Sequence, residues 1–81
     1  MPTYIALYRG INVGGNNPVK MEALRAFHER LGHRGVRHYI QSGNVVFSAT
    51  GSADALARIL AVAFEKEFGF AARVLVVEAD A

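Results

Sequence analysis

The chain has 81 residues, of which 52% are hydrophobic, and a formal net charge of +2 at pH 7. This length allows one domain with a small core, and the composition excludes a disordered segment. The absence of cysteine excludes disulfide frameworks, thiolate metal sites and cysteine nucleophiles, and it suggests a cytoplasmic location. No apolar run is long enough to span a membrane. The mild charge disfavours nucleic acid as a partner.

The first half of the chain predicts a strand followed by a helix. Thr3–Arg9 is a short apolar and aromatic run, typical of a strand that is largely buried on both faces. A loop rich in glycine and asparagine, Gly10–Asn17, comes next. Pro18 suits the start of the helix and Gly32 suits its end. The helix is amphipathic because apolar residues recur at helical spacing, at Met21, Leu24, Phe27 and Leu31.

The second half predicts three strands and a second helix. Two strands, Val36–Ile40 and Asn44–Ser48, flank a short turn that contains glycine, which is typical of a hairpin. Ser52 is suited to cap the second helix and Gly69 to end it. A last strand is predicted at Ala72–Val77.

The order β-α-β-β-α-β predicts an α+β fold: a single ferredoxin-like split sandwich over residues 1–81, with a four-stranded antiparallel sheet and two helices on one face. Right-handed crossover makes the first and second strands parallel, and the third lies between them only if it is antiparallel to both. The carboxyl end of the first strand and the turn after the second strand then meet at one end of the sheet.

A polar candidate site is expected where these loops meet. Its guanidinium, amides, hydroxyl and backbone N–H groups lie beside the start of a helix and suit a small anionic or nucleotide-like ligand. The alternative is structural: glycine and asparagine supply positive φ angles, and the polar side chains brace the turns. The candidate ligand-binding residues are Arg9, Asn12, Gly14, Gly15, Asn16, Gln41, Ser42 and Asn44.

Two strings within these stretches resemble a known family. They are Arg9–Gly15 and Tyr39–Phe47, with Met21 opening the helix between them. In their order and spacing they resemble the bacterial domain of unknown function family numbered 1697. The resemblance implies an α+β fold and brings no assigned reaction. Members of that family usually continue past the position of Ala81, so the chain looks like an amino-terminal portion of a longer protein.

The sequence gives little support for an enzyme. Gly10 and Gly15 have the spacing of a phosphate-binding loop, but no lysine and hydroxyl residue follow. Ser42 lacks a histidine oriented by an acid. The histidines at 28, 33 and 38 recur every five residues, a period that brings them onto no common face. We therefore expect no catalytic residue, no metal site and no cofactor, and a non-enzymatic binding domain.

Two other functions stay open. The sheet face away from the helices is expected to be apolar, through Tyr4, Ala6, Tyr8, Val46 and Leu75, and to support a homo-dimer or the docking of a carboxyl-terminal segment. RNA binding is the weaker alternative. Tyr4, Tyr8 and Tyr39 suit base stacking, but the third strand lacks the expected aromatic and basic consensus.

Overall fold

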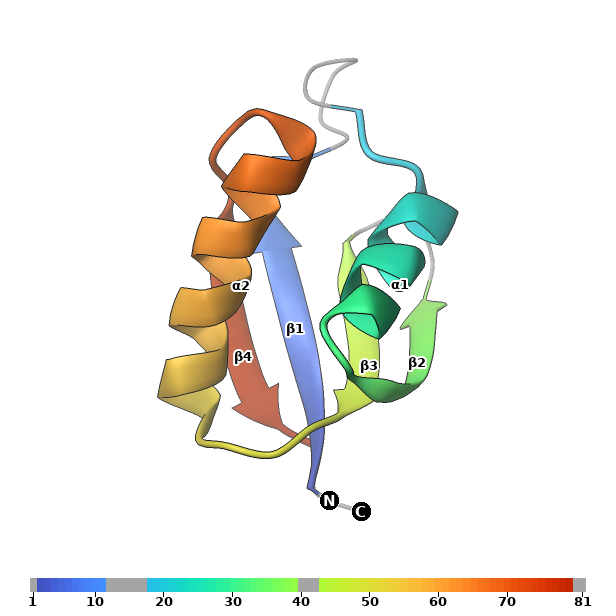
Figure 1. Ribbon diagram of the computed structural model, residues 1–81, viewed down its shortest axis with the longest axis vertical. Helices are drawn as coiled ribbons and strands as arrows, with labels where there is room; N and C mark the ends of the chain where they lie inside the picture. Colours follow the sequence, from blue (N-terminus) through green and yellow to red (C-terminus); the bar gives the residue numbers. More distant parts are fainter. Residues whose placement is uncertain (1, 12–17, 40–42, 80–81) are drawn as a thin grey trace.

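The computed structural model describes residues 2–11, 18–39 and 43–79. The elements follow the predicted order (Figure 1). They are β1 (Thr3–Arg9), α1 (Met21–Arg30), β2 (Arg34–Tyr39), β3 (Asn44–Ser48), α2 (Ala53–Phe68) and β4 (Arg73–Glu78).

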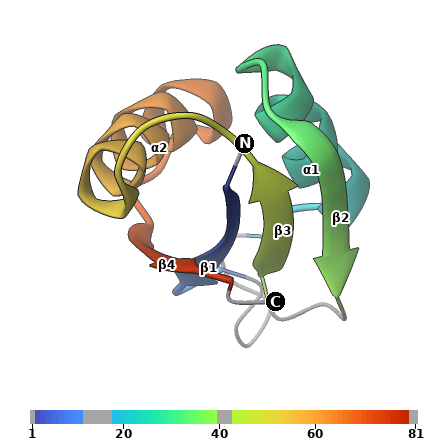
Figure 2. The ribbon, with the colours of Figure 1, turned by 90° about the horizontal axis from the view of Figure 1, so that it is seen from below.

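The four strands form one sheet in the order β2-β3-β1-β4, and each neighbouring pair is antiparallel. β3 lies between β2 and β1, as the crossover argument predicts. Both helices lie on the same side of this sheet, and the other side is open (Figure 2). The predicted ferredoxin-like α+β fold is confirmed.

The residues that end the helices act as predicted. The backbone N–H of Ala55 donates to the Ser52 hydroxyl over 3.1 Å, so Ser52 caps α2. Gly69 ends α2 with a φ of 84°. Gly32 follows α1 and has a φ of 89°. These local signals set where each helix begins or ends.

The bounds of two strands differ from the prediction. β2 begins at Arg34, before the predicted Val36, because it pairs with β3 across a bulge between Arg34 and Arg37. Its predicted last residue, 40, lies outside the described residues. β4 lies one residue later than predicted at each end. Backbone pairing at the sheet edges, which hydrophobic alternation does not report, sets these ends.

The core lies between the helices and the sheet, and it corrects the predicted face of β1. Tyr4, Ala6 and Tyr8 point toward the helices, and their side chains are 3%, 0% and 2% exposed. They therefore belong to the core, together with Phe47 and Phe64, and the prediction that they lie on the open face is wrong. The hydroxyls of Tyr4 and Tyr8 have hydrogen-bond partners on the helix side, the Gly51 carbonyl and Nε2 of His28, so these amphipathic rings can be buried there. β1 is thus buried on one face and half-buried on the other.

Candidate functional site

The described residues that flank the two predicted loops lie close together at one end of the sheet. The backbone N–H of Tyr8 donates to the carbonyl of Gly43 over 3.0 Å. Gly43 has a φ of +80°, and a Cβ atom there would lie 2.8 Å from the Tyr8 carbonyl oxygen and 3.1 Å from Cδ1 of Ile11. Only glycine allows this approach. Gly43 is therefore held against Tyr8 near the end of β1.

Two of the predicted site residues belong to the described part of the chain. Arg9 is the exposed last residue of β1, and Asn44 is the half-buried first residue of β3, opposite Leu7. Arg9 and Asn44 thus lie diagonally on the same, open face of the sheet. The other six lie outside the described residues: Asn12, Gly14, Gly15, Asn16, Gln41 and Ser42.

A second arginine lies at this end of the sheet, and the sequence analysis did not single it out. Arg73 lies directly opposite Arg9 in the register of β1 and β4, and both are exposed. Like charges directly opposite each other destabilise a sheet. Within the described ranges, the ion pair joins Arg30 to Glu67, and neither Arg9 nor Arg73 contacts a carboxylate. This end of the open face is therefore positively charged.

The rest of the open face is apolar. Across the sheet, Ile5 lies opposite both Val46 and Val77, and Leu7 lies opposite Leu75. Leu75 is 42% exposed and Val77 is 46% exposed, both on β4. We call the five side chains the apolar stripe: Ile5, Leu7, Val46, Leu75 and Val77. It replaces the predicted patch, of which only Val46 and Leu75 lie on this face.

The two outer strands of the sheet differ. β2 carries the bulge between Arg34 and Arg37, and Gly35 within it has a φ of 59°. Bulges and charged residues protect a sheet edge from pairing with another strand. β4 pairs with β1 over six consecutive residues without a shift, and its inner sequence Val74–Val77 is apolar throughout. Between Arg73 and Glu78, the β4 edge therefore has neither a bulge nor a charged residue to prevent pairing with another strand.

Three buried side chains are connected by hydrogen bonds, and this feature was not predicted from the sequence. The Tyr8 hydroxyl lies 2.7 Å from Nε2 of His28, and Nδ1 of His28 lies 2.9 Å from Nδ1 of His33. His28 is 0% exposed, and the His33 ring stacks on Phe47 at 4.5 Å. The five-residue spacing suggested different faces, but the chain turns back after α1 at Gly32. The backbone N–H of His33 then donates to the carbonyl of His28.

Burial keeps all three side chains neutral. It lowers the pKa of His28 to about 3, and neighbouring His33 adds to this effect. Burial also lowers the pKa of His33 below its ordinary value, and it raises the pKa of Tyr8. Desolvation disfavours every charged form. At neutral pH the three hydrogen-bonded side chains are therefore one phenol and two neutral imidazoles.

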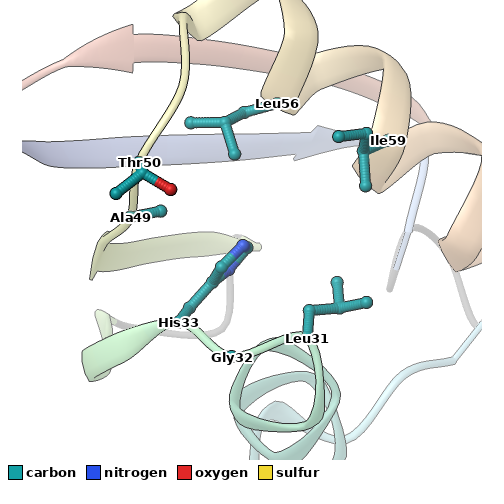
Figure 3. Close-up of a pocket in the computed structure, with 7 residues that line it drawn as sticks. All are labelled: Leu31, Gly32, His33, Ala49, Thr50, Leu56 and Ile59. Atoms are coloured by element: carbon teal, nitrogen blue, oxygen red, sulfur yellow. The ribbon is translucent and has the colours of Figure 1, made fainter.

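His33 also lines a pocket of about 210 Å³. In Figure 3 the imidazole points into it between Leu31 and Ala49, and Leu56 and Ile59 of α2 lie on the opposite side. Leu31 and Ile59 are 39% and 53% exposed, so the pocket opens to solvent. The lining residues are Leu31, Gly32, His33, Ala49, Thr50, Leu56 and Ile59. Apart from His33 and Thr50, no lining side chain is polar.

Membrane-spanning helices and clusters of metal ligands are both absent from residues 2–11, 18–39 and 43–79. In these ranges, no helix has the length and apolar composition needed to cross a membrane. No three acidic, histidine or cysteine side chains of the same ranges come together as metal ligands.

Comparisons with known proteins agree with the resemblance noted in the sequence. The conserved bacterial protein SP0830 from Streptococcus pneumoniae has a similar structure, with a TM-score of 0.84 and 36% sequence identity. The match covers 95% of this chain and 43% of that chain, so this chain spans less than half of its length. No curated protein matches the chain. A family model described as a protein of unknown function, DUF1697, matches residues 1–81, and the chain belongs to this family.

Proposed function

We propose that this chain is a protein-interaction module that pairs with a second copy of itself through the β4 edge. The observation that carries the proposal is that the apolar stripe reaches an outer strand that lacks protection. Leu75 and Val77, which are 42% and 46% exposed, both lie on β4. Pairing of two β4 strands makes one continuous sheet and joins the two stripes.

The charges of β4 favour a second copy in the antiparallel direction. The strand begins with Arg73 and ends with Glu78, and the residues between them are apolar. Antiparallel pairing places Arg73 and Arg73 of the partner subunit at opposite ends of the interface, so the two like charges stay apart. Arg73 and Glu78 lie on opposite faces of the sheet and do not pair with each other. Parallel pairing would place like charges together. Two-fold symmetry, the commonest symmetry of dimers, generates the antiparallel arrangement.

The side chains of β4 also match one another across such an axis. Residues opposite each other in an antiparallel pair lie on the same sheet face, so only registers that keep this parity are allowed. A two-fold axis at Val76 places Leu75 opposite Val77 of the partner subunit, twice. Apolar cross-strand pairs of this kind contribute ~0.2–1 kcal/mol each, in addition to the surface that they bury.

Sedimentation velocity over a range of concentrations tests the proposal, with two matched variants. Val77→Lys places a charge on β4, and Val62→Lys places the same charge on α2, where Val62 is 71% exposed. We expect the wild-type mass to rise with concentration toward that of a dimer. Val77→Lys should stay monomeric, and Val62→Lys should behave as the wild type. Circular dichroism verifies the fold of each variant.

Three results would contradict pairing through β4. The first is a monomer at every concentration, which would favour another occupant of this face, such as a carboxyl-terminal segment. The second is equal dimerisation of both lysine variants, which would place the interface elsewhere. The third is a dimer that Val62→Lys disrupts and Val77→Lys does not, which would place the interface on α2.

A second candidate function is favoured by the charges of Arg9 and Arg73, neither of which has an ion-pair partner among the described residues. We propose a site for a small anionic ligand, with Arg9, Arg73 and Asn44 as its described residues. The six residues outside the described ranges complete the proposed set. Paired guanidinium groups bind carboxylate and phosphate oxygens through several charge-assisted hydrogen bonds. This function requires no catalytic step.

An amide-shift titration with inorganic phosphate tests this site. Arg9→Ala should weaken phosphate binding and leave the free energy of unfolding nearly unchanged or raise it, because it relieves repulsion with Arg73. Arg58→Ala, an exposed arginine on α2, is the matched control. A large loss of stability in Arg9→Ala without any change in binding would make Arg9 a structural brace.

A further inference from the structure

The pocket beside His33 is independent of both proposed functions. Its polar character depends on the hydrogens in the Tyr8, His28 and His33 chain. The phenol O–H of Tyr8 and Nε2 of His28 are partners of each other, and neither has a second partner among the described residues. The distances of 2.7 Å and 2.9 Å allow one hydrogen in each contact. The placement of these hydrogens decides what His33 offers to the pocket.

Two arrangements of the hydrogens are available. In one, His33 donates from Nδ1 to His28, and His28 donates from Nε2 to the phenol oxygen. The buried phenol hydrogen then has no acceptor among the described residues. In the other, Tyr8 donates to Nε2 of His28, and His28 donates from Nδ1 to Nδ1 of His33. Every buried hydrogen of this second arrangement has an acceptor, so it is the stable one.

The second arrangement fixes the tautomer of His33. Its Nδ1 is an acceptor, so the neutral ring carries its hydrogen on Nε2. His33 is thus a hydrogen-bond donor without charge at the pocket, in a wall that is otherwise mostly apolar. A neutral donor does not attract anions as an arginine does.

We propose that this pocket binds a small, mostly apolar molecule with one uncharged hydrogen-bond acceptor, such as a ketone, which accepts from Nε2–H of His33. The volume supports this class of ligand. The pocket measures about 210 Å³. By comparison, an apolar cavity of about 150 Å³ holds benzene. The side chains of Leu31, Leu56 and Ile59 cover the apolar part of the ligand.

Titration of the labelled chain with two probes of similar shape tests the inference. Acetophenone has the acceptor and isopropylbenzene lacks it. We expect both to shift amides around the pocket, with acetophenone binding about fivefold more tightly, which is the net effect of one hydrogen bond. Only acetophenone should shift the Nε2–H resonance of His33. The ¹⁵N shifts of the free protein should show hydrogens on Nδ1 of His28 and Nε2 of His33.

Two pairs of variants separate binding from folding. His33→Phe keeps a ring against Phe47 and removes the donor, so both probes should bind equally. Ile59→Trp fills the pocket and should abolish binding of both probes, whereas Val62→Trp, three residues along α2 and outside the lining, should leave binding intact. Each variant is accepted only with a native amide spectrum. If His33→Phe does not fold, the Nε2–H resonance of the wild type and the comparison of Ile59→Trp with Val62→Trp still test whether the probes bind in this pocket.

Three results would overturn the inference. The first is an absence of shifts around the pocket with both probes. The second is equal affinity for the two probes in the wild type. The third is a hydrogen on Nδ1 of His33, which would leave Nε2 as an acceptor and exclude the proposed contact.

Discussion

The Tyr8 hydroxyl and Nε2 of His28 lie 2.7 Å apart inside the core, and they join strand β1 to helix α1. Both side chains are almost completely buried. A buried polar pair keeps its stabilising effect only while both partners remain in their neutral, bonded forms. Protonation of His28 and removal of the Tyr8 hydroxyl should therefore both destabilise the fold.

Acid should destabilise the protein well above the range in which carboxylates titrate. Burial lowers the pKa of His28 from 6.5 to about 3. The unfolded chain therefore binds more protons than the native one below pH 6.5, and stability falls as pH falls toward 3. The free energy of unfolding should decrease by up to ~1.4 kcal/mol per pH unit for one such histidine. Urea unfolding between pH 7 and pH 5 measures the slope.

A control identifies the histidine responsible. His38 is exposed on the outer strand β2, and His38→Gln should leave the slope unchanged. His28→Gln should reduce the slope to the part that His33 contributes, since burial lowers the pKa of His33 as well, at the cost of lower stability at pH 7. A wild type whose stability is constant between pH 7 and pH 5 would contradict a neutral buried His28.

Tyr8→Phe should destabilise the fold by ~1–3 kcal/mol, because it leaves Nε2 of His28 buried without its partner. Tyr4→Phe is the matched control. The Tyr4 hydroxyl donates to the carbonyl of Gly51, which is an exposed residue, so water can replace the lost bond. We expect a smaller loss for Tyr4→Phe in the same urea unfolding experiment. The opposite order would show that the contact with His28 contributes little.

Gly43→Ala should destabilise the protein by more than ~2 kcal/mol, since a left-handed backbone alone costs an alanine ~1–2 kcal/mol. The new methyl group would also lie 2.8 Å from the Tyr8 carbonyl oxygen. Gly51→Ala separates the two causes, because Gly51 has a φ of +108° and nothing within 4 Å of the added atom. Thermal unfolding of both variants gives the difference, and equal losses would mean that the contact with β1 can relax.

Ser52→Ala should cost ~1 kcal/mol through loss of the helix cap. The hydroxyl accepts from the Ala55 N–H at the first turn of α2. Ser52→Asp keeps an acceptor at this position and should retain the stability. If the alanine and aspartate variants unfold at the same temperature, the cap makes no net contribution.

The sequence predicts those parts of the fold that local chemistry determines. Ser52 and Gly69 mark the two ends of α2 because capping and left-handed backbone depend on single residues. The arrangement of the strands follows from the crossover rule. The sequence does not determine which face of β1 packs against the helices, because both faces of Thr3–Arg9 carry apolar or aromatic residues. Tyr4 and Tyr8 are as suited to an open face as to a core.

The candidate site was predictable only in part. The closeness of the two loops is a prediction from topology, and in the described residues Gly43 contacts Tyr8 near the end of β1, as that topology requires. Arg73 escaped the prediction because its position opposite Arg9 depends on the register of two strands far apart in the sequence. The contact between His28 and His33 was not predicted, because helical periodicity applies only within the helix and His33 lies beyond its end. The turn at Gly32 reverses the chain and brings the two rings together.

The position of β1 in the sheet has a consequence for synthesis on the ribosome. β1 emerges first, yet its two neighbours come much later, since Thr3 pairs with Ser48 and Tyr4 pairs with Glu78. Until residue 78 has left the exit tunnel, the central strand lacks one complete side. Sheets built from such distant segments fold slowly, and their unpaired strands aggregate easily. The nascent chain therefore carries β1 without its strand partners until β3 and β4 have emerged, which is the interval in which a chaperone would matter most.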